Sequence, residues 1–371
     1  MNMKVKASNK ELFDEVINTG LCTLCGACSG GCPYLVPYKG RIVLLDNCIL
    51  PEGQCYQYCP RTYTDMDAIS RQLFGVPYSD HELGMTMEVL MARSTDVRIK
   101  ERAQYGGTVT TLLSLALGEG LIDSAILSRM YDNKTPDACQ VRNMEEVLQC
   151  AGSNYMACPV LRVLNYIPKH SEERLAIVTT PCQGLALAKM KHNPPQNRVD
   201  INNVKLVIGL FCTWALSPDE FHKFLKENLD LPQVIKFDIP PPPANRFDAY
   251  TPFGKILFPL DQIKEFIMPT CSYCLDMTSE FADISLGSVE GLEGWNTVIV
   301  RSKVGAELME IAKAKGKLEV DTLLPQNLAH LKEAALLKKK RALGQIIERS
   351  GDKRNLLYLG LSEGIVNRLL S

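Results

Sequence analysis

Cysteine is the residue type in this 371-residue sequence whose number and spacing could do chemistry. Four of its fourteen cysteines form the run Cys22-Thr-Leu-Cys25-Gly-Ala-Cys28-Ser-Gly-Gly-Cys32-Pro33. The C-x2-C-x2-C-x3-C-P spacing is typical of iron–sulfur binding, in which three thiolates bind one 4Fe-4S cluster and the fourth binds a second cluster. Zinc is the alternative metal, although zinc sites usually use two separated cysteine pairs rather than a triplet.

A second cysteine segment follows, and its Cys59-Pro60 ending repeats the end of the first run. In paired segments of this kind the ligands cross from one segment to the other. One cluster would then be bound by Cys22, Cys25, Cys28 and Cys59, and the other by Cys32, Cys48 and Cys55. The second set has only three thiolates. Its fourth ligand must therefore come from another cysteine or another residue type, or that cluster is incomplete or missing.

Four cysteines farther along the chain form a third set, Cys182, Cys212, Cys271 and Cys274. The first two follow apolar segments that we expect to be strands, and the last two form a C-x2-C turn. Since the carboxyl ends of parallel strands meet at one edge of a sheet, all four can converge there. Four thiolates bind zinc as well as iron–sulfur clusters, and the upstream cysteine segments favour iron–sulfur.

The remaining cysteines are Cys139, Cys150 and Cys158. They look isolated in the sequence, and we expect them to be small buried apolar side chains.

Composition bounds the class of protein. Hydrophobic residues make up 46% of the chain and charged residues 22%, as in folded soluble proteins, and the length suggests two or three domains. A net charge of −1 gives no broad basic face, so we expect no nucleic-acid partner. No segment has the roughly 18 uninterrupted apolar residues of a membrane span, and residues 1–6 do not begin an apolar signal core. We therefore expect a cytoplasmic protein, in which many cysteines indicate metal or redox chemistry rather than disulfides.

Apolar strands alternate with helical patterns through the middle of the chain, which predicts an α/β fold with a largely parallel sheet. We expect strands at 123–128, 174–180, 205–211, 281–288 and 295–301, helices at 143–150, 157–166, 185–191 and 218–229, and a hairpin at 247–258. A helix at 9–19 and a strand at 41–45 flank the first cysteine segments, and 61–102 looks like a polar connector. The predicted domains are a ferredoxin-like iron–sulfur module at 1–65, an α/β core at 66–303 and a helical C-terminal region at 304–371.

A Gly106-Gly107 turn runs directly into a predicted helix, with Thr108 as the expected N-cap. The N–H groups at a helix N-terminus suit a phosphate group or the edge of a flavin ring. The alternative is a tight loop before a core helix, because the full G-x-G-x-x-G fingerprint is absent.

Together these segments resemble the family of the beta subunits of coenzyme F420-reducing hydrogenase and formate dehydrogenase. The same family includes the electron-input subunit of F(420)H(2) dehydrogenase and 7-hydroxymethyl chlorophyll a reductase. The similar segments follow the family order over roughly residues 100–315. They are Gly106-Gly107-Thr108, Ala151-Gly152-Ser153, Thr180-Pro181-Cys182-Gln183, Gly209-Leu-Phe-Cys212, Cys271-Ser-Tyr-Cys274, Ala282-Asp283-Ile284-Ser285 and Gly294-Trp295-Asn296. Asn154 stands where many relatives have a lysine.

The resemblance implies an iron–sulfur flavoprotein oxidoreductase with FAD and two or three 4Fe-4S clusters. The flavin-binding residues would be Gly106, Gly107, Thr108, Ser153, Asn154, Thr180 and Gln183, and the third cysteine set would bind a cluster beside the flavin. The implied function is electron transfer between a hydride-carrying coenzyme, F420 or NAD(P)H, and a partner such as a hydrogenase or formate dehydrogenase. The alternatives are an electron-wiring subunit without a small-molecule substrate and a reductase of an organic double bond. No catalytic acid or base is predicted.

Overall fold

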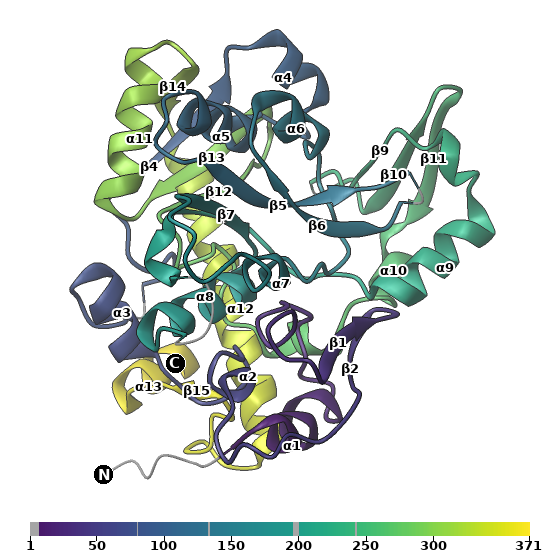
Figure 1. The fold of residues 1–371 in the computed structure, drawn as a ribbon. Helices are drawn as coiled ribbons and strands as arrows, with labels where there is room; N and C mark the ends of the chain where they lie inside the picture. Colours follow the sequence, from purple (N-terminus) through teal and green to yellow (C-terminus); the bar gives the residue numbers. More distant parts are fainter. Residues whose placement is uncertain (1–6, 80, 133, 196–199, 242) are drawn as a thin grey trace.

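An eight-stranded sheet forms the centre of the computed structural model, which describes residues 7–79, 81–132, 134–195, 200–241 and 243–371 (Figure 1). The strand order is β14-β4-β13-β12-β8-β7-β5-β6. Its four parallel strands are β5 (Ser124–Met130), β7 (Leu175–Thr179), β8 (Val204–Leu210) and β12 (Ile284–Val289). Its antiparallel strands are β4 (Glu88–Ser94), β6 (Pro136–Val141), β13 (Leu292–Val300) and β14 (Leu318–Thr322). The α/β class is confirmed, whereas the expectation of a largely parallel sheet is wrong, because only the central strands are parallel.

Helices cover both faces of this sheet, as Figure 1 shows. One face is covered by α5 (Thr108–Gly118), α6 (Met144–Gln149) and α11 (Lys303–Ala314), which bury a continuous apolar core against the strands. The other face is covered by α7 (Leu161–Leu164), α8 (Pro181–His192) and α12 (Pro325–Ser350). The segment 61–102, predicted to be a connector, instead contains β3 (Thr64–Asp65), α3 (Met66–Phe74), β4 and α4 (Val97–Arg102). Within the described residues, no helix has the length and apolar character that crossing a membrane requires.

The N-terminal segment lies under the large sheet in the view of Figure 1. It comprises α1 (Asn9–Leu12), which continues as a π-helix (Phe13–Ile17), the hairpin of β1 (Leu35–Tyr38) and β2 (Arg41–Leu44), and α2 (Gln54–Gln57). The predicted strand at 41–45 is confirmed as β2. The N–H of Leu161 donates to the Cys25 carbonyl at 3.1 Å, and Asn165 Nδ2 donates to the Ser29 carbonyl at 2.5 Å. A Cβ at Gly26 would lie 2.6 Å from the Pro159 carbonyl oxygen, so the first cysteine turn needs glycine to approach the core this closely.

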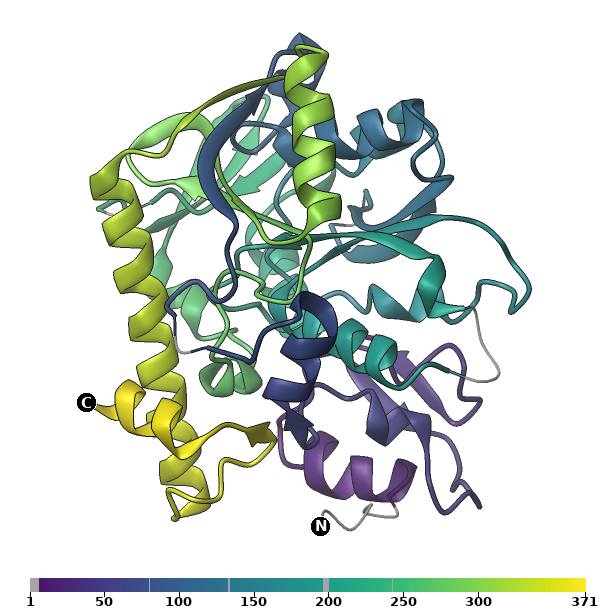
Figure 2. The ribbon, with the colours of Figure 1, turned by 90° about the vertical axis from the view of Figure 1, so that its left-hand side faces the viewer.

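The prediction of a wholly helical region from residue 304 to the C-terminus is wrong, because this region also contains two strands. Its strand β14 joins the large sheet beside β4, and β15 (Leu359–Gly360) pairs with β3. Helix α12 runs down one side of the molecule to its lower end in the view of Figure 2, and α13 (Glu363–Leu370) packs against it. Near the end of α12, Arg349 donates to the Thr19 carbonyl at 2.8 Å, so this helix connects the core to the N-terminal segment. The predicted domain boundaries stay predictions.

A smaller unit projects from one end of the sheet. It consists of α9 (Pro218–Asn228), α10 (Leu260–Lys264) and the sheet of β9 (Lys236–Asp238), β10 (Arg246–Thr251) and β11 (Gly254–Pro259). The hairpin predicted at 247–258 is confirmed as β10–β11. Short 3₁₀ turns at Ile201–Asn203, Leu231–Gln233 and Pro269–Tyr273 complete the described elements.

A buried ion pair anchors α12 to the loop before β12. Lys339 Nζ lies 2.5 Å from Glu280 Oε1, and the two side chains are 1% and 2% exposed. We expect Lys339→Met to lower the free energy of unfolding by about 3–5 kcal/mol, because it leaves the Glu280 carboxylate buried without its cation. Urea unfolding compared with the exposed control Lys332→Met measures this effect. Equal midpoints for the two variants would contradict it.

Candidate functional site

The structure brings Cys22, Cys25, Cys28 and Cys59 together in the N-terminal segment. Burial raises the pKa of the Cys28 thiol, and the neighbouring thiols of Cys25, Cys22 and Cys59 act in the same direction. Burial, with Cys59 acting in the same direction, also raises the pKa of Cys22 to about 12. Thiols that are buried close together lose their protons only if a nearby positive charge stabilises the thiolates, since water does not reach them. The iron ions of a bound iron–sulfur cluster supply that charge. This donor set fits a cluster, although the ligand role itself stays a prediction.

Cys32, Cys48 and Cys55 form a second thiol group next to the first. Burial raises the pKa of Cys55 to about 12, with the thiols of Cys32 and Cys48 as further causes. A Cβ on Gly53 would lie 2.9 Å from the Cys55 sulfur, so glycine keeps space beside this thiol. The thiols that act on the pKa of Cys55 are those of Cys32 and Cys48, the other two members of the predicted set. The fourth ligand of this predicted cluster therefore stays a prediction, with another cysteine, another residue type and an incomplete or missing cluster as the alternatives.

The third group gathers at the carboxyl edge of the parallel strands. Cys182 follows β7 at the start of α8, Cys212 follows β8, and Cys271 and Cys274 belong to the turn at 269–274. Burial raises the pKa of Cys271 to about 11, and Cys274 and Cys182 act in the same direction. The same three thiols surround Cys212. The Cys271 sulfur also accepts the Ala215 N–H at 3.3 Å, the kind of bond that tunes a cluster thiolate.

The three thiol groups lie in series. Cys28 of the first group interacts with Cys55 of the second, and Cys22 interacts with Cys182 of the third. In the described part of the chain, no three histidine, cysteine, aspartate or glutamate side chains converge as ligands of a single metal ion. The thiols are therefore grouped more loosely than ligands around one ion. The identity of the metal centres remains a prediction.

Buried cations accompany the thiol groups. Arg61 donates from Nε to Thr270 Oγ1 at 3.0 Å, stacks on the Tyr358 ring at 4.6 Å, and interacts with Cys274 and Cys182. Lys189 Nζ donates to the Cys59 carbonyl at 2.7 Å, and burial lowers its pKa to about 8. Lys338 Nζ donates to the Cys212 carbonyl at 2.6 Å. Positive charges in these places would stabilise reduced, more negative clusters.

We expect Arg61→Met to lower the midpoint potential of the cluster bound by the third group, by an amount on the order of tens of millivolts. The reason is the loss of one buried positive charge near Cys182 and Cys274. A redox titration followed by electron paramagnetic resonance measures the shift. The exposed Arg71→Met is the control, and an unchanged potential in Arg61→Met would show that this charge does not act on the cluster.

The Gly106-Gly107 turn leads into a helix as predicted, but the predicted N-cap, Thr108, is wrong. The N-cap is Gly107, with φ of +72°, and Thr108 is the first residue of α5. The Thr108 hydroxyl donates to the Ala92 carbonyl at 3.1 Å, so it does not cap the helix. Instead, Asn296 Oδ1 in β13 accepts the Thr108 N–H at 3.2 Å. Asn296 is a positioning residue that the sequence did not reveal, since it lies 188 residues away.

Hydrogen bonds connect the loop after α6 to the third thiol group. Asn154 Nδ2 donates to Ser128 Oγ at 2.7 Å at the end of β5, and Ser128 also contacts the Cys158 thiol. Gln183 Nε2 donates to the Cys158 carbonyl at 2.7 Å. Of the predicted flavin residues, Asn154 and Gln183 therefore lie at the carboxyl edge of the sheet, and Ser128 and Cys158 join them there.

Thr180 completes the series of hydrogen bonds between the loop after α6 and the third thiol group. Its N–H donates to Gln183 Oε1 at 2.9 Å, and its hydroxyl lies 3.4 Å from the Cys182 sulfur. The buried Asn154 Oδ1 has no hydrogen-bond partner among the described residues. An unsatisfied buried acceptor calls for a donor, and an N–H or O–H of a bound molecule such as a flavin fits this need.

Two tyrosines bring the Gly106-Gly107 turn and the Ser153-Asn154 loop to the same place. Burial raises the pKa of Tyr105 to about 12, and Asp238 in β9 adds to the shift. Tyr155, which interacts with Tyr105, has its hydroxyl 3.5 Å from Asp238 Oδ1 and also interacts with Ser153. The predicted flavin residues are thus distributed around one edge of the sheet, between β9 and the third thiol group.

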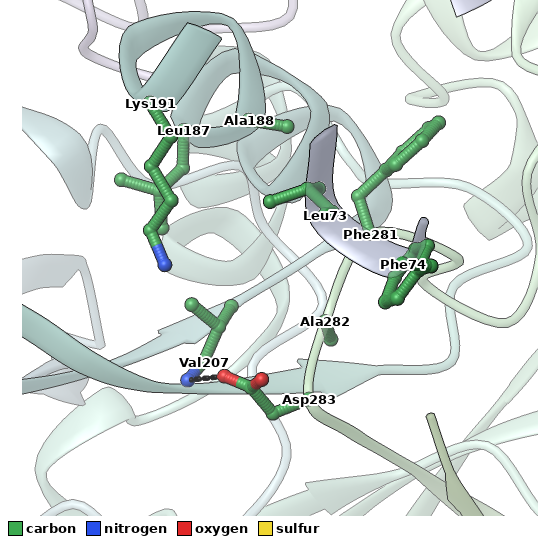
Figure 3. Close-up of a pocket in the computed structure, with 9 residues that line it drawn as sticks. All are labelled: Leu73, Phe74, Leu187, Ala188, Lys191, Val207, Phe281, Ala282 and Asp283. Carbon is green, nitrogen blue, oxygen red and sulfur yellow. Dashed lines mark hydrogen bonds between the residues drawn. The ribbon is translucent and has the colours of Figure 1, made fainter. Parts of the chain in front are cut away.

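Two cavities lie elsewhere. The first, of about 30 Å³, has room for little more than a water molecule, and Figure 3 shows Lys191 directed into it toward Asp283. Asp283 Oδ2 accepts the Val207 N–H at 2.7 Å. The second, of about 580 Å³, is lined mainly by the segment 76–86 before β4. Neither cavity is lined by a predicted flavin or cluster residue.

Cys139 and Cys150 are not isolated, contrary to expectation. Their sulfur atoms lie 3.5 Å apart, and both side chains are partly exposed. The sequence could not show this contact, because it depends on how α6 packs beside β6. Cys158 is buried, as expected.

Comparison with known proteins gives matches over most of the chain. Two family models of the coenzyme F420 hydrogenase/dehydrogenase beta subunit match, the N-terminal model over residues 89–165 and the C-terminal model over residues 172–325. Coenzyme F420 hydrogenase subunit beta of Methanothermobacter thermautotrophicus is 31% identical over 72% of this chain and 96% of the relative. Coenzyme F420-dependent sulfite reductase of Methanocaldococcus jannaschii is 30% identical over 84% of this chain, which spans 49% of that protein. The F420-reducing NiFe hydrogenase complex from Methanosarcina barkeri contains a chain that superimposes with a TM-score of 0.68 at 30% identity, covering 73% of this chain and 94% of that one.

Proposed function

Because this chain belongs to the coenzyme F420 hydrogenase/dehydrogenase beta-subunit family, we propose that it transfers electrons between coenzyme F420 and a partner redox protein. FAD would exchange a hydride with the coenzyme, and 4Fe-4S clusters would carry single electrons. The observation that carries the proposal is the series of three thiol groups, which begins at the predicted flavin edge of the sheet and ends in the N-terminal segment. Such a series suits stepwise electron transfer.

The chain's own residues would hold FAD at the carboxyl edge of the sheet. The Gly106-Gly107 turn lets the backbone approach closely, and Asn296 holds that turn in place. Asn154 would offer its unpaired Oδ1 to a donor on the flavin, while Thr180 and Gln183 would fix the backbone beside Cys182. No side chain of the site is assigned a role as general acid or base, because the chemistry that FAD would supply is direct hydride exchange with the coenzyme.

We expect Gly106→Ala to weaken FAD binding at least about 10-fold, because a new Cβ would lie 2.8 Å from both the Ala92 carbonyl and Asn296 Oδ1. The turn must then shift away from its present position. FAD affinity measured by fluorescence quenching tests this. Gly118→Ala, at the other end of α5, is the control, since a Cβ there meets nothing within 4 Å. Equal affinity in both variants would remove this turn from the flavin site.

The exit for electrons would be the second thiol group. Beside Cys48, Ile49 is 97% exposed, and Leu45 and Leu50 are 64% and 58% exposed. Exposed apolar side chains next to a predicted redox centre suit a partner surface, since large apolar side chains are usually covered in the working complex. A heteromeric partner such as a hydrogenase or a formate dehydrogenase would dock here.

The test uses anaerobically purified chain reconstituted with iron, sulfide and FAD. Viologen reduction is followed with reduced F420 and with NADH in parallel. We expect viologen reduction with reduced F420 and none with NADH. Turnover with NADH alone would mean that the coenzyme site is built for a nicotinamide. No turnover with either coenzyme, with FAD and clusters bound, would make the chain an electron-wiring subunit and overturn the proposal.

A further inference from the structure

The contact between Cys139 and Cys150 lies outside the machinery proposed above. The two sulfur atoms are 3.5 Å apart, and a disulfide requires about 2.05 Å. Closing the remaining distance of about 1.5 Å is within the range of side-chain rotation and small backbone adjustment. The thiols are therefore already placed for bond formation.

The two cysteines are held by elements that fix their separation. Cys139 lies in the middle of β6, the edge strand, where it pairs with Leu127 of β5. Cys150 is the residue at which α6 ends, and this helix packs on α5 over the same face of the sheet. Both side chains pack beside the core on that face, yet both keep partial exposure. The pair is therefore not sealed from solvent, and a small disulfide such as oxidised glutathione can approach it.

The surroundings favour a thiolate at Cys139 and a protonated thiol at Cys150, because the hydrogen bond with Cys139 and burial raise the pKa of Cys150. The hydrogen bond with Cys150 lowers the pKa of Cys139, and the guanidinium of Arg129 in β5 acts in the same direction. Burial and the nearby carboxylates of Asp137 and Glu146 act in the opposite direction. A thiol with a neighbouring thiol and a nearby cation is the usual arrangement of an exchange-reactive cysteine.

We propose that Cys139 and Cys150 form a reversible dithiol–disulfide site, oxidised by an external disulfide. The thiolate of Cys139 would attack one sulfur of that disulfide, form a mixed disulfide and release the other half as a thiolate. Cys150, on losing its proton, would attack the Cys139 sulfur and release the second half. The two protein thiols are thereby oxidised, one external disulfide is reduced to two thiols, and the protons pass to these products.

Oxidation at this site acts on the loop that follows Cys150. The segment 151–160, which begins with residues 151–156, connects α6 on one face of the sheet to α7 on the other, as Figure 1 shows. Asn154 in this loop is bonded to Ser128 of β5. A disulfide ties the beginning of the loop to the edge strand, so it restricts the loop at its first residue. This consequence for flavin binding rests on the proposed function, whereas the covalent site does not.

Tryptic peptides test the covalent site directly. The full chain, reconstituted anaerobically, is equilibrated with mixtures of oxidised and reduced glutathione, quenched with acid, alkylated and digested. Cleavage after Lys134, Arg142 and Arg162 places Cys139 and Cys150 in different peptides, 135–142 and 143–162. We expect these peptides to be joined in more than half of the chains under oxidising conditions and separate after reduction.

Three variants identify the bond. Cys158 shares the second peptide with Cys150, so Cys158→Ser must retain the joined pair, whereas Cys139→Ser and Cys150→Ser must lose it. Joined peptides that persist in Cys150→Ser, or no joined peptides in the wild type at high oxidised glutathione, would overturn the proposal. A far-ultraviolet circular dichroism spectrum equal to that of the wild type in all three variants shows that they fold.

Amide hydrogen exchange tests the consequence for the loop. We expect exchange over residues 151–156 to slow at least about 3-fold on oxidation of the wild type and to stay unchanged in Cys139→Ser. Equal exchange in the oxidised and reduced wild type would refute an effect on the loop. Neither experiment uses F420 or any coenzyme turnover, so the outcome is separate from that of the proposed function.

Discussion

Cys271→Ser is expected to lose about four iron atoms and four acid-labile sulfides per chain while retaining FAD. Cys271 belongs to the third thiol group, where it neighbours Cys274 and Cys182 and accepts the Ala215 N–H. Without this thiolate one corner of the cluster has no protein ligand. Viologen reduction by the coenzyme should fall by more than the roughly 10- to 100-fold that follows loss of a hydrogen-bond partner of a metal ligand.

Iron and sulfide analysis, flavin release on denaturation and the coenzyme assay measure these effects in one preparation. Cys139→Ser, assayed under reducing conditions, is the matched control, because Cys139 belongs to none of the three thiol groups. Full iron content in Cys271→Ser would remove this residue from the ligand set. A wild-type chain that binds zinc and contains no acid-labile sulfide would end the redox interpretation altogether.

The convergence of the thiols could be predicted because it follows from local signals. Short spacings limit where Cys22, Cys25 and Cys28 can point, and apolar strands place Cys182 and Cys212 at one edge of a sheet. The structure brings these residues together as the spacing and the strand ends indicated. The chemistry at these thiols is an inference from residue type, so it needs the metal analyses above.

The outer strands of the sheet could not be predicted, because their signals are not local. β4 has a short apolar run in a polar segment, and it becomes a strand by pairing with β13 and β14 more than 200 residues later. In β14 only Leu318 is fully buried, so its five residues resemble an exposed loop. Long-range pairing supplies the stability that such segments lack by themselves.

The same reason explains the site residues that the sequence missed. Asn296 accepts the first N–H of α5 only because β13 lies beside the Gly106-Gly107 turn, and Ser128 contacts Asn154 only because β5 ends at that edge. Nothing in the type of either residue distinguishes it from other polar residues on strands. In both cases the role depends on tertiary packing. Spacing predicts the ligands of a metal centre better than the residues that hold an organic cofactor, whose contacts come from distant segments.

Cys25→Ser is expected to stop reduction of the protein partner without stopping reduction of FAD by the coenzyme. Cys25 lies in the first thiol group with Cys59 and Cys22, between the third group and the second. Reduction of FAD by the coenzyme should continue at about the wild-type rate, because the flavin edge of the sheet is unchanged. Reduction of the protein partner should fall to background, because the series is interrupted at its middle member. Stopped-flow bleaching of the flavin and steady-state partner reduction measure these two reactions separately.

Comparison with Cys48→Ser decides how far the series extends. Cys48 belongs to the three-thiol group, beside the exposed Ile49. If that group binds a complete cluster, Cys48→Ser must lose partner reduction as Cys25→Ser does, with a loss of about four irons. If it binds none, Cys48→Ser must keep both the iron content and partner reduction, and electrons must leave from the first group. Partner reduction that survives in Cys25→Ser as well would mean that the N-terminal segment is not the exit route, and that the partner receives electrons directly from the third group at the edge of the sheet.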